Sequence, residues 1–100
     1  MKKFEMPKLN LKGSSKQVQW ATDIIAAVYT TANDNIKRAY DLQWPHAAKW
    51  EEGFEKIISQ LEGFLSKNDK AGDIIACREK FDPERILSFA NKYVNREALK

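Results

Sequence analysis

An apolar face that keeps the same helical phase from residue 14 to residue 42 constrains this chain more than any other feature of its sequence. Placed at about 100° per residue, the apolar side chains of this stretch fall on one side of a helix. They are Val18, Ala21, Ile25, Val28, Tyr29, Ala32, Ile36, Ala39 and Tyr40, and Trp20, Ile24, Ala27, Thr31 and Leu42 widen the face sideways. The pattern predicts one helix from about Ser14 to about Leu42, roughly 40 Å long at about 1.5 Å per residue.

Three weak helix formers, Asn33, Asp34 and Asn35, fall inside this stretch without shifting its phase. We therefore expect one continuous helix, and a break near Asn33 is the alternative. So wide an apolar face indicates a helix that is covered on two sides. Such a helix lies either at the centre of a bundle or partly in a homodimer interface.

The start of this helix has the spacing of a capping box. Ser14 and Gln17 are placed so that each side chain bonds the backbone N–H of the other. Gly13 and Lys16 add a second interpretation, because a glycine turn and a lysine at a helix start can bind an anion. The spacing does not match the G-x-x-x-x-G-K-[ST] phosphate loop, so we expect capping, and Gly13 and Lys16 remain candidate binding residues.

A second helix is predicted from about Pro45 to Lys67, because Trp44-Pro45 ends the first helix and proline suits the first turn of the next. Its expected buried residues are Trp50, Phe54, Ile57, Ile58, Leu61, Phe64 and Leu65. Gly53 and Gly63 each weaken this helix by roughly 1 kcal/mol relative to alanine, or allow another helix to approach closely.

Two shorter helices are predicted after it. Residues 68–69 offer a turn and an N-cap for a third helix over residues 70–80. Residues 82–84 predict the start of a fourth, since an Asp cap, a proline and an acid favour a helix N-terminus. The side chains expected to be buried are Ala71, Ile74, Ile75, Cys77 and Phe81 in the third helix and Ile86, Leu87, Phe89, Ala90, Tyr93 and Val94 in the fourth.

Residues 1–13 have the pattern of an extended arm. Phe4, Met6, Leu9 and Leu11 alternate imperfectly around Pro7, and no second strand is evident. Three fates are open: the arm lies on the helices, pairs with another molecule or stays mobile. The predicted fold is all-α, a four-helix bundle-like single domain over residues 14–100 with a long first helix and this extended N-terminal arm.

Composition narrows the class of protein. The chain has 100 residues, which suits one domain, and no apolar run approaches the roughly 20 residues that span a bilayer. The start MKKFEMPKLN lacks the apolar stretch of a signal peptide. A single cysteine, Cys77, cannot form an internal disulfide. We therefore expect a cytoplasmic protein that does not contact the membrane.

No residue set points to catalysis, a metal or a cofactor. One cysteine and one histidine, Cys77 and His46, are too few for a usual zinc site. Cys77 falls on an apolar helix face, where free cysteine behaves as a small hydrophobe. The second helix also carries a group of glutamates with lysines among them, as on a solvated helix face. They are Glu51, Glu52, Glu55 and Glu62, with Lys49 and Lys56. We expect no enzyme activity, no cofactor and no metal.

The basic charge is concentrated at the N-terminal end. The net charge is +3, and the first sixteen residues carry five lysines, Lys2, Lys3, Lys8, Lys12 and Lys16, against one acid, Glu5. Lysines spaced along an arm can follow phosphates, with affinity supplied by counterion release. These lysines and Gly13 are the candidate binding residues, and a DNA- or RNA-binding accessory protein is the alternative function.

The stretch LKGSSKQVQWA resembles a pattern, L-x-G-S-x-K-Q-x-x-W-A, found near the start of small proteins of bacteriophages, prophages and other mobile elements. The matching residues are Leu11, Gly13, Ser14, Lys16, Gln17, Trp20 and Ala21. A looser similarity covers Ala71, Ile74, Ile75 and Arg78. The resemblance implies a phage or mobile-element protein, and small phage proteins of this size include anti-CRISPR and other inhibitors that bind a host protein.

We therefore predict a non-enzymatic protein that binds a macromolecular partner, with a host or phage protein favoured over nucleic acid. Inhibition of a bacterial defence nuclease is the form of binding that the resemblance implies.

Overall fold

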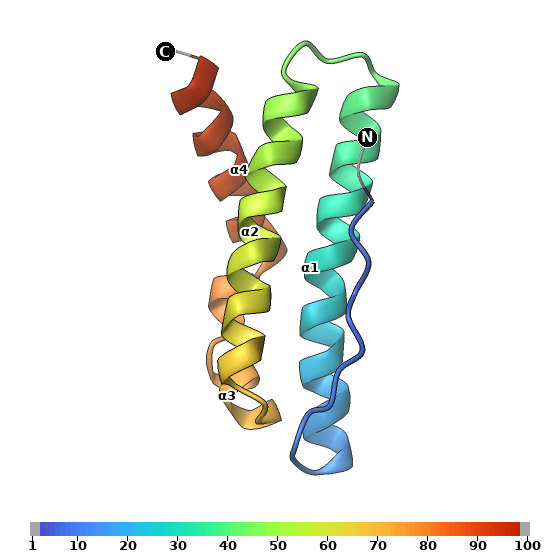
Figure 1. Ribbon diagram of the computed structural model, residues 1–100, viewed down its shortest axis with the longest axis vertical. Helices are drawn as coiled ribbons and strands as arrows, with labels where there is room; N and C mark the ends of the chain where they lie inside the picture. Colours follow the sequence, from blue (N-terminus) through green and yellow to red (C-terminus); the bar gives the residue numbers. More distant parts are fainter. Residues whose placement is uncertain (1–2, 99–100) are drawn as a thin grey trace.

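The computed structural model describes residues 3–98, and this part of the chain is all-α and forms one compact unit (Figure 1). Its elements are α1 (Ser15–Asp41), α2 (Ala47–Lys67), α3 (Ala71–Ala76), the 3₁₀ helix η1 (Arg78–Phe81) and α4 (Pro83–Ala98). The predicted fold class is confirmed.

The long first helix is continuous, so the alternative of a break near Asn33 is wrong. The capping box is present as predicted. The backbone N–H of Gln17 donates to Ser14 Oγ at 3.2 Å, and the backbone N–H of Ser14 donates to Gln17 Oε1 at 3.2 Å. These two bonds satisfy N–H groups that a helix start otherwise leaves without a partner.

The second helix begins two residues later than predicted, at Ala47. Gln43 adopts a left-handed backbone conformation with φ 53°, and the N–H groups of Leu42, Gln43 and Trp44 bond back to carbonyls of the last turns of α1. The turn between the two helices therefore extends through Pro45, which does not open α2.

The predicted third helix over residues 70–80 is wrong in its second half. The α-helical part ends at Ala76, and Cys77 (φ −99°, ψ 12°) leads into η1. The N–H of Cys77 is shared between the carbonyls of Asp73 and Ile74, both at 3.2 Å, the bifurcated bond common at helix ends. Cys77, expected to be buried, is only half-buried as a result.

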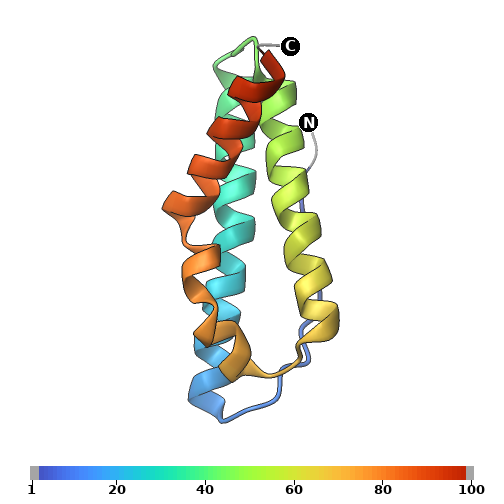
Figure 2. The same ribbon diagram turned by 90° about the vertical axis from the view of Figure 1, so that its left-hand side faces the viewer.

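Helices α1 and α2 run antiparallel, and the segment from α3 to α4 lies along one side of this pair (Figure 2). Helix α1 contacts α2, α3, η1 and α4, so most of its wide apolar face is covered within the chain. Helix α4 approaches α2 closely at Gly53, where a Cβ would lie 3.3 Å from Tyr93 Cδ1 and 3.4 Å from Ala90 Cα. One of the two predicted roles for this glycine, close approach of another helix, is confirmed.

The core is a continuous apolar cluster that draws on all four α-helices. Its fully buried large side chains are Phe54, Ile25, Ile36, Ile58, Leu61, Ile74 and Val28. Trp20, Leu42 and Phe89 belong to the predicted apolar faces, yet they are exposed by 50%, 70% and 36%. These side chains are therefore only partly covered by the rest of the chain.

The N-terminal arm lies on the helices, which is the first of its three predicted alternatives. It runs antiparallel to α1 on the side of the α1–α2 pair that α3 and α4 leave open (Figures 1 and 2). Phe4, Met6, Leu9 and Leu11 pack against the core. The backbone N–H of Phe4 donates to Asn33 Oδ1 at 2.8 Å, and Asn33 Nδ2 donates to the carbonyl of Phe4 at 2.7 Å. The amide of Asn33 thus pairs with the arm as a neighbouring strand would.

Replacing Asn33 by alanine should release the beginning of the arm, because both hydrogen bonds to Phe4 are removed. We expect a decrease of about 1–2 kcal/mol in the free energy of unfolding, measured by urea denaturation. Asn35→Ala is the matched control, since it brings the same gain in helix propensity and removes only a bond within α1, from Asn35 Nδ2 to the carbonyl of Thr31. Equal stability of the two variants would contradict the role of Asn33.

Candidate partner-binding surface

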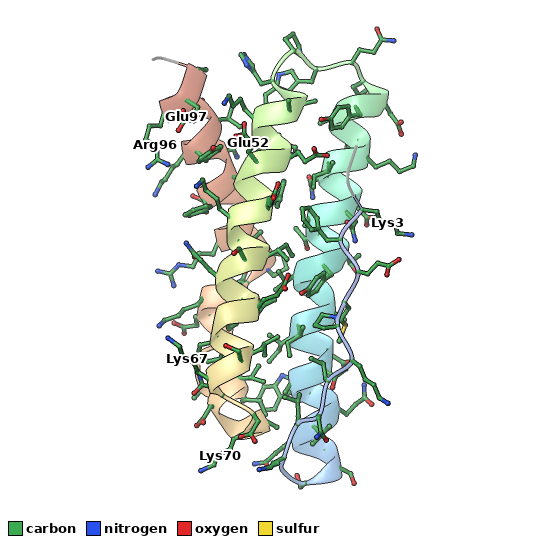
Figure 3. All side chains as sticks on the ribbon, in the orientation of Figure 1. Lys3, Glu52, Lys67, Lys70, Arg96 and Glu97 are labelled. Carbon is green, nitrogen blue, oxygen red and sulfur yellow. The ribbon has the colours of Figure 1, made fainter. Side chains whose placement is uncertain are left out.

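The lysines predicted to bind a partner are spread along the molecule. Lys3, Lys8, Lys12 and Lys16 are exposed, and Lys2 lies outside the described residues. Because the arm runs antiparallel to α1, Lys3 lies well along that helix, where it points away from it (Figure 3), while Lys12 and Lys16 lie near its beginning. Folding therefore does not gather these lysines into one tight cluster.

Lys12 has a structural role that the sequence did not indicate. Its backbone N–H donates to the carbonyl of Asp69 at 2.8 Å, and its carbonyl accepts from the N–H of Ala71 at 2.8 Å. Its Nζ lies 3.0 Å from Asp69 Oδ2, and the hydrogen bond from Lys12 lowers the pKa of Asp69. The arm is thereby joined to the α2–α3 connection, which supplies the pairing partner that sequence patterns did not reveal.

Gly13 is explained by the same junction. Its φ of +149° is a conformation that side chains rarely adopt. A Cβ there would lie 3.0 Å from Gln17 Oε1 and 3.3 Å from Ala71 Cβ. Gly13 lets the chain turn into α1 while it passes close to α3, a requirement that capping alone does not impose. Lys16 makes no such contact in the first turn of α1, where it is exposed.

Candidate metal ligands are not grouped in the part of the chain that the structure describes. Within residues 3–98, no three His, Cys, Asp or Glu side chains are grouped to hold a metal ion. His46 directly precedes α2 and Cys77 directly follows α3, so these two residues lie in different connections between helices. Glu52 lies 3.0 Å from Lys49 Nζ on the outer side of α2.

Tyr29 is the deeply buried titratable side chain of α1. Burial raises the pKa of its phenol, and the carboxylate of Glu62 raises this pKa further. Its hydroxyl has no hydrogen-bond partner among the described residues. Tyr29 therefore stays neutral in the core, as its place on the apolar face predicts.

The most prominent exposed aromatic residue is Trp20, which lines a groove between α1 and the η1–α4 segment. We call it the Trp20 groove. Its apolar walls are Trp20, Ile24 and Ala27 of α1 with Phe81 and Pro83, and its charged residues are Asp23, Arg78, Glu79 and Asp82. The groove has a volume of about 380 Å³. It is an open surface feature of the size that accepts one or two side chains of a partner.

Arg78 lies over the indole of Trp20, with its guanidinium carbon 5.5 Å from the ring centroid. This cation–π contact favours one orientation of Trp20, half of whose surface is exposed. The sequence placed Trp20 on the flank of the apolar face but did not indicate its contact with Arg78, because Arg78 reaches Trp20 only where the α-helix ends before Cys77. Cys77 separates α3 from η1.

Comparison with known proteins gives no further assignment. No family model matches the sequence, and neither curated proteins nor solved structures show a match. Among the described helices, none has the length and apolar character needed to cross a membrane.

The structural role of Gly13 can be tested by replacing it with alanine. We expect Gly13→Ala to lower the free energy of unfolding by about 1–3 kcal/mol, because the backbone would be strained and Ala71 crowded. Gly63→Ala should instead raise it by roughly 1 kcal/mol, since its Cβ would meet open space on α2. Urea denaturation measures both. A stable Gly13→Ala variant would restore an anion-binding explanation for this glycine.

Proposed function

We propose that this chain is a non-enzymatic binding protein that contacts a partner protein through the Trp20 groove. The observation that carries the proposal is Trp20 itself, half-exposed and held by Arg78 beside an apolar hollow. Tryptophan and arginine are enriched among the residues that dominate binding energy in protein interfaces. An oriented aromatic ring also loses little conformational entropy when a partner covers it.

The resemblance of residues 11–21 to small phage proteins supports a bacterial partner. Of the residues that match the pattern, Gly13, Ser14 and Gln17 shape the start of α1. Trp20 and Lys16 are exposed and are the matched side chains placed to contact a partner. We propose a host protein as that partner, with a defence nuclease as the example that the resemblance favours. The setting we propose is the bacterial cytoplasm, where a lone cysteine stays reduced.

Replacing Trp20 by alanine should abolish partner binding and leave the fold intact, because half of the side chain lies outside the core. We expect tagged wild-type protein to recover one stoichiometric protein from a bacterial lysate, and W20A to recover none of it. The decrease should exceed about 2 kcal/mol in binding free energy once the partner is purified.

Leu42→Ala is the control for this experiment, since Leu42 is an even more exposed apolar residue at the other end of α1. It should retain the partner. Equal recovery by W20A and wild type would refute the role of the Trp20 groove, and recovery of no protein from several hosts would count against the function.

Nucleic-acid binding is the second candidate function, and one observation favours it. The backbone bridge between Lys12 and Lys70 adds Lys70 to the basic end of the arm, and Lys16 lies nearby in the first turn of α1. Against it, the arm is fixed to the helices by Asn33 and by its apolar residues. Its lysines therefore cannot follow a phosphate backbone as a mobile tail would.

The lysines of the arm side can be removed without disturbing this packing. If they bind DNA, a K3A/K8A/K16A variant should flatten the dependence of log affinity on log salt by about 0.9 for each phosphate that the variant no longer neutralises. Gel shifts at several salt concentrations measure this slope. K56A/K80A/K92A removes the same charge from the α2–α4 side and should leave the slope unchanged. An equal change of the slope in both variants would show that the binding is nonspecific electrostatic attraction.

A further inference from the structure

A second groove, on the other side of Phe81 from Trp20, has opposite charge. It lies between α2, η1 and α4, and we call it the α4 groove. We propose that it binds an acidic segment of a partner protein, in which aromatic or aliphatic side chains are flanked by Asp or Glu. This goes beyond the Trp20 groove, because it assigns a separate surface and a different partner chemistry.

The floor of the α4 groove is aromatic and preformed. Phe64 of α2 and Phe81 of η1 meet edge to face, with ring centroids 5.6 Å apart and an interplanar angle of 63°. Phe89 of α4 is 36% exposed beside them, and Ile57 closes the floor from α2. The groove has a volume of about 390 Å³, near the lower end of the range for ligand pockets. It therefore has room for one or two apolar side chains.

The charged residues of the α4 groove are both positive. Lys80 of η1 and Arg85 of α4 line it, and both are exposed. An apolar side chain seated on the phenylalanines would bring its neighbours in the partner close to these two cations. Carboxylates at those neighbouring positions give charge-assisted pairs, and a bidentate pair with Arg85 is the strongest of these.

The same face of α4 continues this charge toward its end. Phe89, Lys92 and Arg96 follow Arg85 at helical spacings of four, seven and eleven residues, which places them along one side of the helix. Figure 3 shows Arg96 on the outside of α4. Its guanidinium carbon lies 5.5 Å from the ring centroid of Tyr93, which orients it. A bound segment can therefore extend along α4 and meet further positive charge.

Two glutamates of α2 on this side belong to a different hollow. Glu52 and Glu55, with Lys56 beside them, line a separate depression nearer the start of α2, and Glu52 accepts a hydrogen bond from the hydroxyl of Tyr93 at 3.5 Å. The Trp20 groove, by contrast, carries Asp23, Glu79 and Asp82 against one arginine. An acidic segment is thus matched by the α4 groove and repelled by the Trp20 groove.

The test is a selection of displayed random twelve-residue peptides on the immobilised full-length protein. Peptides with Asp or Glu on both sides of an aromatic or aliphatic residue should be enriched. A selected peptide, added to ¹⁵N-labelled protein, should shift the amide signals of Arg85 and Phe89 more than those of Trp20. Enrichment of basic or uncharged peptides, enrichment of none, or signals that move elsewhere would overturn the proposal.

Charge-reversal variants separate recognition from general attraction. K80E/R85E should lower the affinity for the selected peptide by about tenfold or more, because two attractive ion pairs are replaced by repulsion between like charges. The K3E/K16E variant changes the net charge by the same amount on another side of the molecule, and it should bind the peptide as tightly as the wild type does. W20A should also bind normally, so that failure of the Trp20 groove and failure of the α4 groove are distinguished. Equal weakening by both reversals, or stronger shifts at Arg85 and Phe89 with a DNA duplex than with the peptide, would contradict a peptide groove.

Discussion

The apolar face of α1 must be covered along its whole length, and the rest of the chain is arranged around that requirement. A helix of 27 residues with so wide an apolar face is not stable alone in water. Helix α2 covers part of this face, and the shorter α3, η1 and α4 follow one another along a second part. The arm covers a third part with four apolar side chains. Contacts within the chain therefore bury most of this face.

The beginning of the chain is a structural element although it contains no helix or strand of its own. Two hydrogen bonds between Phe4 and Asn33, one donated by each residue, hold its beginning. Two backbone hydrogen bonds of Lys12 hold its end beside α3. Asparagine has a low helix propensity, and Asn33 lies in the middle of α1. Its side-chain amide bonds the backbone of the arm as a neighbouring strand would. The sequence pattern around Lys12 and Gly13 indicated a ligand site. In the folded chain, both residues serve to place the arm against the helices.

The end of the α-helix before Cys77 shapes the Trp20 groove and the α4 groove. If the third helix continued through residue 80, the side chains of residues 78–81 would point in the directions that the α-helical repeat sets. The 3₁₀ turn instead brings Arg78 over Trp20 and Phe81 against Phe64. Phe81 then lines both grooves. A short and local change of backbone conformation thus creates two surfaces of opposite charge on a chain whose net charge is only +3.

Apolar periodicity and bonds within one turn were enough to predict the all-α class, the length of α1, its capping box and the start of α4. They also offered close helix approach as one role for Gly53. The position of the arm, the need for glycine at residue 13 and the exposure of the flanking aromatic residues came only from the folded chain. These outcomes depend on contacts between residues far apart in the sequence, such as Phe4 with Asn33 and Trp20 with Arg78. Periodicity carries no information about such pairs, since it describes one element at a time.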